Sequence, residues 1–168
     1  MRLRLGLLGW LLPLMPVAAQ HNVLTIHNDL ARTGQYLTET ILAPSNLSST
    51  TFGKRFQITL DGVVDAEPLY VASVPIPNQG THNVLIVATE NDSLYALDAD
   101  TGSQLWKSAL LGSNETPSDD RGCDQVTPQI GITSTPTIGL NPGATGGAIF
   151  AVAMSKDSSG NYHNDCTR

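Results

Sequence analysis

Apolar and polar residues alternate in short stretches along much of the chain, as they do in β-strands with one buried face. Residues 56–60 place Phe56, Ile58 and Leu60 on one side of such a strand, and an Asp-Gly turn signal follows. Residues 84–88 are apolar without alternation, which predicts a strand that is covered on both faces. The pattern therefore favours β structure from residue 56 onward.

Four predicted strands follow one another closely and indicate a small antiparallel sheet. They span residues 68–74, 84–88, 93–98 and 104–110. Turn signals separate the later strands, and an insertion is expected over residues 75–82. A polar connection over residues 112–130 comes next and is longer than most connections in compact domains.

The strand pattern then restarts, which indicates an internal repeat. Residues 132–138 resemble the first strand in their early proline, and residues 148–154 resemble the second. Aligning Asp92 with Asp157 places Val87 over Val152, an offset of 65 residues. Residues 157–168 contain no further strand that the pattern predicts.

The N-terminus has the features of a signal peptide. Arg2 and Arg4 precede an apolar run over residues 5–15, and small residues at 17–19 predict cleavage after Ala19. The apolar run is too short for a membrane span, which needs about 20 residues. We expect a periplasmic or secreted protein without a membrane span, where a Cys123–Cys166 disulfide would be permitted but is not required.

Composition narrows the range of partners. Charged residues make up only 14% of the chain, while Ser and Thr number 30, which is typical of turn-rich β proteins. The net charge is −6, and it would become −8 once the two arginines of the leader are removed. Nucleic-acid binding is not expected, because it depends on clustered Lys and Arg.

One motif, A-x-D-x-x-T-G-x-x-x-W, has a physical reason at each defined position. It comprises Ala96, Asp98, Thr101, Gly102 and Trp106. A small alanine allows a second sheet to approach, and the aspartate can accept hydrogen bonds from the backbone of the turn. The glycine can adopt positive φ, and the broad indole can cover a neighbouring sheet.

Two other interpretations of this motif are possible. An EF-hand calcium loop that began at Asp98 would need a glutamate at its twelfth position, where the sequence has Ala109. The second alternative is an ordinary hairpin in which the tryptophan has no special role.

With this motif and its flanking strands, the chain resembles the β-propeller repeats of the pyrroloquinoline-quinone (PQQ) family. The resemblance is strong over residues 84–110 and weaker over 52–74 and 131–154. It implies an all-β, partial β-propeller of about one and a half four-stranded antiparallel blades after the signal peptide. We expect a signal peptide over residues 1–19, an irregular segment over 20–51, incomplete blades over 52–163 and a disordered tail over 164–168.

The same resemblance raises the question of a cofactor. PQQ-dependent dehydrogenases of this fold hold the quinone and Ca²⁺ on the propeller axis, but no set of those ligands can be transferred to this sequence. The connection before the second repeat contains the best candidate ligand loop, although a solvated acidic loop explains these residues more readily than a cofactor site does. That loop comprises Asp119, Asp120, Arg121, Cys123 and Asp124.

Two hypotheses for function follow from the resemblance. The first is a non-catalytic binding or assembly scaffold, whose partner is the remaining blades of a propeller or another protein. The second is the N-terminal piece of a quinoprotein dehydrogenase that uses PQQ and calcium. Propellers have four to eight blades, so we expect a fragment of a longer protein. No catalytic residue is predicted: Ser134 lacks a nucleophile motif, and the four histidines lack metal-like spacing.

Overall fold

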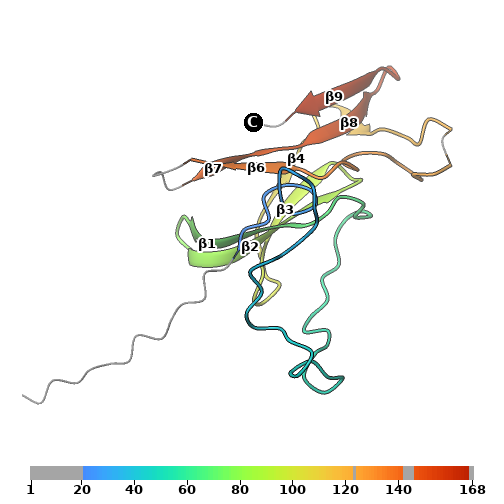
Figure 1. The fold of residues 1–168 in the computed structure, drawn as a ribbon. Helices are drawn as coiled ribbons and strands as arrows, with labels where there is room; N and C mark the ends of the chain where they lie inside the picture. Colours follow the sequence, from blue (N-terminus) through green and yellow to red (C-terminus); the bar gives the residue numbers. More distant parts are fainter. Residues whose placement is uncertain (1–20, 123, 142–145, 167–168) are drawn as a thin grey trace, which may run out of the picture.

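The computed structural model describes residues 21–122, 124–141 and 146–166, and the predicted signal peptide lies outside them. The described chain is all-β, with antiparallel sheets of four, three and two strands, none of which is closed (Figure 1). Within these residues, no helix has the length and apolar character needed to cross a membrane.

The first sheet confirms the four predicted antiparallel strands. It consists of β1 (Leu69–Ile76), β2 (Gly80–Thr89), β3 (Ser93–Asp98) and β4 (Gln104–Ala109), in the order β1-β2-β3-β4. The insertion expected over residues 75–82 is wrong, because Pro75 and Ile76 pair with Thr81 and Gly80. These strand ends are exposed and polar in part, so their pairing leaves no hydrophobic pattern in the sequence.

The residues predicted as a second repeat, called the second repeat below, form two smaller sheets and not one four-stranded sheet like the first. β5 (Glu115–Pro117), β8 (Val152–Asp157) and β9 (Tyr162–Cys166) make the three-stranded sheet, in the order β5-β8-β9. β6 (Thr137–Leu140) and β7 (Gly147–Phe150) make the two-stranded sheet. Only Ala151 separates β7 from β8, so the predicted strand over residues 148–154 is one extended segment that takes part in both sheets.

Two expectations about this repeat are wrong. The polar connection over residues 112–130 contains β5, which pairs with β8, and the C-terminal stretch contains a third strand, β9, which also pairs with β8. Residues 164–166, expected within a disordered tail, belong to β9. Both strands lie at the edges of their sheet, where backbone hydrogen bonds hold polar residues in place. Polar edge strands lack the apolar pattern by which the other strands were predicted.

The first sheet and the second repeat pack together through a shared core. The end of β2 meets the second repeat where Ile132 N donates to Thr89 O, and Gly131 bridges Met154 of β8. A Cβ at Gly131 would lie 1.8 Å from Glu90 O, so the approach is very close. The core joins residues from both repeats: Leu69, Val71, Val84, Ile86, Ala88, Leu94, Ala96, Ile132, Ile138, Ala151 and Ala153.

Both parts of the chain contribute side chains to the shared core. Ile86 and Ala88 enter it from the first sheet, and Ala151 and Ala153 enter it from the second repeat. Phe150 and Val152, which alternate with these alanines, are exposed. The offset of 65 residues between the repeats stays a prediction.

Residues 56–60 are not a strand, contrary to the prediction. They are extended without ladder pairing, and Ile58 and Leu60 pack against Val87, Tyr95 and Leu97 on the other face of the first sheet. The apolar residues of this segment alternate because they pack onto the face of the first sheet, not because the segment is itself a strand of a sheet. This segment explains why residues 84–88 read as a strand covered on both faces, since Val84, Ile86, Val87 and Ala88 are all buried.

Candidate functional site

The turn between β3 and β4 is organised by the Asp98 carboxylate. Its Oδ1 accepts hydrogen bonds from Thr101 N at 2.7 Å, Thr101 Oγ1 at 2.8 Å and Asp100 N at 3.1 Å. Gly102 N donates to Asp98 O at 2.8 Å, and Gly102 has φ +79°. Asp98, Thr101 and Gly102 therefore act together as one turn, as the motif predicts.

His82 completes this turn from the neighbouring strand. Its Nδ1 lies 2.7 Å from Asp98 Oδ2, and its Nε2 lies 3.0 Å from Gln79 O. The bond to His82 and those from Thr101 lower the pKa of Asp98 to about 2, while the bond to Asp98 raises the pKa of His82. Their pairing could not be predicted from the sequence, because His82 and Asp98 lie on different strands and share no motif.

Ala96 and Trp106, the remaining motif residues, face each other in the β3–β4 ladder. Ala96 is fully buried, and the half-buried Trp106 packs against the core that joins the two repeats. Trp106 also lines a groove of about 520 Å³ together with Ile138 and Ile149 of the second repeat. The indole therefore lies at the junction between the repeats.

A second polar centre, which the sequence did not reveal, forms around Asp61. Its carboxylate accepts hydrogen bonds from Thr89 Oγ1, Asn91 Nδ2, Ser93 Oγ and Lys107 Nζ, over distances of 2.7 to 3.0 Å. Burial raises the pKa of Asp61, but the four donors, Lys107 foremost, outweigh burial and hold it well below its ordinary value. Asp61 thereby fixes the N-terminal segment to the β2–β3 hairpin and to β4.

The candidate ligand loop is attached to the second repeat. Lys156 Nζ lies 2.5 Å from Asp119 Oδ2, and Tyr162 OH donates to Asp119 Oδ1 at 2.9 Å. The bond from Lys156, then that from Tyr162, lowers the pKa of Asp119. The guanidinium of Arg121 lies 4.5 Å from the centre of the Tyr162 ring, a cation–π contact.

The other residues of this loop are not brought into a common site. Asp120 Oδ1 accepts a hydrogen bond from Gly122 N at 2.9 Å, and Asp124 is exposed. Cys123 lies outside the described residues, so its pairing with Cys166 stays a prediction. Among the residues that the structure describes, no group of three or more His, Cys, Asp or Glu could hold a metal ion.

Comparison of the chain with family models, curated proteins and solved structures found no match.

Proposed function

We propose that the chain belongs to an exported repeat protein of the PQQ-like propeller type and acts as a non-catalytic binding or assembly scaffold. The observation that carries the proposal is the hydrophobic core that the four-stranded sheet shares with the second repeat, with Trp106 at this junction and the Asp98 turn beside it. In repeat proteins, each unit buries one face against the next unit, so a stack of units forms an extended surface that can bind a partner.

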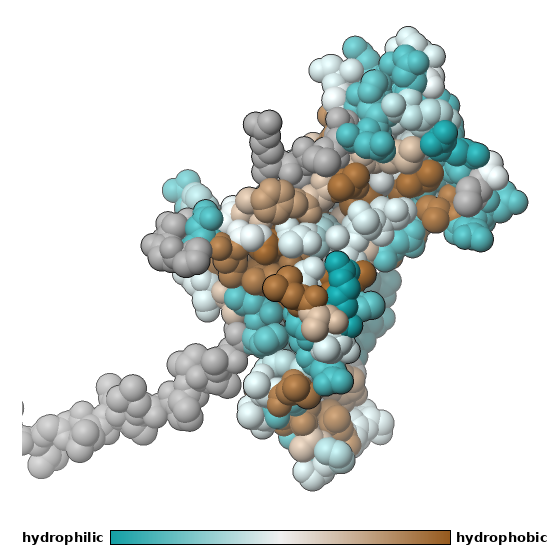
Figure 2. Space-filling model, turned by 45° about the horizontal axis from the view of Figure 1, so that its top comes forward, coloured by the Kyte–Doolittle hydropathy of each residue, from teal (hydrophilic) through white to brown (hydrophobic). Residues whose placement is uncertain are grey.

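The outer face of the second repeat indicates what the scaffold would bind. Phe150 and Val152 are 54% and 48% exposed, whereas Ile86 and Ala88 on the packed face of the first sheet are 3% and 1% exposed. Apolar side chains reach the surface in several separate patches (Figure 2). We infer that a further antiparallel sheet covers Phe150 and Val152, as the second repeat covers Ile86 and Ala88.

The dehydrogenase hypothesis has less support from the contacts of the candidate ligand loop. A cofactor or calcium ion at this loop would require carboxylates that are free to coordinate it. Asp119 is instead paired with Lys156 and Tyr162, and Asp120 accepts a backbone hydrogen bond. A scaffold needs these contacts only to hold the loop in place.

Association of the purified protein tests the scaffold proposal. We expect concentration-dependent association in analytical ultracentrifugation, which a Phe150→Ser, Val152→Thr double variant would reduce. Leu30→Ser is the matched control, because Leu30 is 95% exposed on the N-terminal segment, outside this face. An equal effect of both variants would contradict the docking role, and quinone-dependent dye reduction by the protein with added PQQ and Ca²⁺ would contradict a non-catalytic function.

A further inference from the structure

A cleft of about 820 Å³ lies between the N-terminal segment and the start of β1. Val23 forms part of its wall and is held there by two backbone hydrogen bonds to Tyr70, at 2.8 and 3.0 Å. Several residues from the stretch 34–41 also line the cleft. The residues that line the cleft are His21, Val23, Asn28, Gly34, Tyr36, Thr38, Glu39, Thr40, Ile41, Glu67 and Tyr70.

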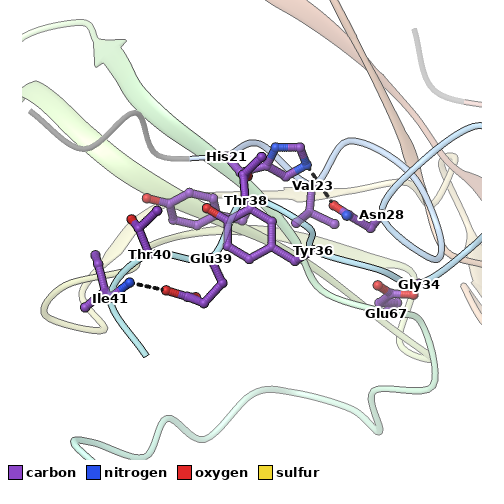
Figure 3. Close-up of a pocket in the computed structure, with 11 residues that line it drawn as sticks. His21, Val23, Asn28, Gly34, Tyr36, Thr38, Glu39, Thr40, Ile41 and Glu67 are labelled. Atoms are coloured by element: carbon purple, nitrogen blue, oxygen red, sulfur yellow. Dashed lines mark hydrogen bonds between the residues drawn. The ribbon is translucent and has the colours of Figure 1, made fainter. Parts of the chain in front are cut away.

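Aromatic rings form one part of this cleft. The rings of His21 and Tyr36 lie 5.0 Å apart at 45° (Figure 3). Tyr70 also lines the cleft and adds a second phenol. His21 is held in place by Asn28, whose Oδ1 lies 3.1 Å from His21 Nε2. The faces of such rings carry negative electrostatic potential, which attracts cations.

Carboxylates add negative charge at opposite ends of the cleft, with Glu39 beside Ile41 and Glu67 beside Gly34 (Figure 3). Glu39 Oε1 accepts hydrogen bonds from the backbone N–H groups of Leu42 and Ile41, which lower the pKa of Glu39. Glu67 Oε2 accepts one from His27 N at 3.0 Å. Backbone donors position a carboxylate without neutralising its charge.

The charge near the cleft is also negative. Burial, and then the negative charge of Asp100, raises the pKa of Tyr70, so its phenol stays protonated at neutral pH. No lysine or arginine is among the described residues that line the cleft. The cleft therefore combines aromatic faces and carboxylates, which disfavours anions and favours a positively charged ligand.

We propose that this cleft is a binding site for a small organic cation, an ammonium group with an apolar body. The ammonium group would lie against the rings of Tyr36 and Tyr70, with the carboxylates of Glu39 and Glu67 supplying negative charge from the two ends of the cleft, and the apolar body would contact Val23. This site is separate from the outer face of the second repeat and does not depend on the scaffold proposal.

Choline is a suitable probe, because 3,3-dimethylbutan-1-ol has the same shape without the charge. We expect isothermal titration calorimetry to detect choline binding and to detect much weaker binding of the alcohol. Equal binding of the two compounds, or no choline binding at millimolar concentration, would overturn the proposal.

Variants locate the site. Tyr36→Leu should weaken choline binding about three- to tenfold, since it removes one cation–π partner, and Glu67→Gln should weaken it by removing charge at constant shape. Phe52→Leu is the control, because Phe52 is exposed and outside the cleft. Circular dichroism would verify that each variant is folded. Unchanged binding in folded Tyr36→Leu and Glu67→Gln would place the cation elsewhere and overturn the assignment.

Discussion

His82 Nδ1 lies 2.7 Å from Asp98 Oδ2, so a histidine on β2 supports the turn that ends β3. Asp98 Oδ1 accepts hydrogen bonds from Thr101 within the turn, so the two carboxylate oxygens have different partners. The same carboxylate thus fixes a local turn and a contact between strands, which makes the turn sensitive to the charge of one imidazole.

We therefore predict a pH-dependent contribution of His82 to stability. The pKa of His82 is raised above its ordinary 6.5, so the contribution is complete below pH 6.5 and is lost as pH rises through the folded-state value. The pKa of Asp98 is lowered from 3.8 to about 2, so its contribution is present above about pH 4 and is lost as pH falls toward 2. The pair stabilises the fold most between these limits.

Thermal unfolding of the wild type and His82→Gln across pH 3 to 9 measures this effect. The melting temperature of the variant should be lower between about pH 4 and 6.5, and the two curves should converge at alkaline pH. A difference that stays constant over the whole range would show that His82 acts by packing and not through its charge.

Gly102→Ala should destabilise the fold by at least about 1 kcal/mol, because the left-handed backbone conformation is costly for residues with a Cβ. Gly102 has φ +79°, and an added Cβ would lie 2.9 Å from Phe56 Cδ2 and 3.1 Å from Ile58 Cδ1. Gly53→Ala is the control, since a Cβ there would meet nothing within 4 Å. Chemical denaturation of both variants compares them, and equal midpoints would contradict the strain at Gly102.

Asp61→Asn should loosen the N-terminal segment. The substitution removes the charge that Lys107 pairs with and exchanges an acceptor for a donor among four hydrogen-bond donors. We expect a loss of about 1–3 kcal/mol, toward the lower end because Lys107 is 37% exposed and salt screens the pair.

Limited proteolysis checks this prediction, because cleavage within residues 50–62 should become faster in Asp61→Asn. Asp124→Asn, a change at an exposed position, should cleave like the wild type. If Asp61→Asn and Asp124→Asn were cleaved at the same rate, Asp61 would not be the residue that holds the N-terminal segment in place.

Sequence alone predicted the parts of the fold that local pattern determines. The strands around residues 84–98 combine β-branched and apolar residues with turn signals, and the Asp98 turn needs only residues within five positions of each other. β5 and β9 were not predicted, because they consist mainly of polar residues that are held in the sheet by backbone pairing with β8 and show no apolar pattern.

The remaining errors involve long-range contacts. The alternation of Phe56, Ile58 and Leu60 has the same period whether these residues pair in a sheet or pack across one. The Asp61 centre joins residues up to 46 positions apart, and the cleft joins His21 and Tyr36 to Glu67 and Tyr70. No local motif marks such groupings, so the candidate cation site could not be predicted from the sequence.

Ala96→Leu should destabilise the protein by about 1–3 kcal/mol, because a larger side chain at a fully packed position forces its neighbours apart. Ala96 is 0% exposed and lies opposite Trp106, where the two repeats meet. The displaced indole should become more accessible to water, and its fluorescence emission should shift to the red. Ala109→Leu is the matched control, since Ala109 lies exposed on the adjacent strand β4. Denaturation followed by tryptophan emission reports both effects together. Wild-type stability and emission in Ala96→Leu would show that the repeats do not pack tightly at Ala96, and would remove the reason for a small residue in the motif.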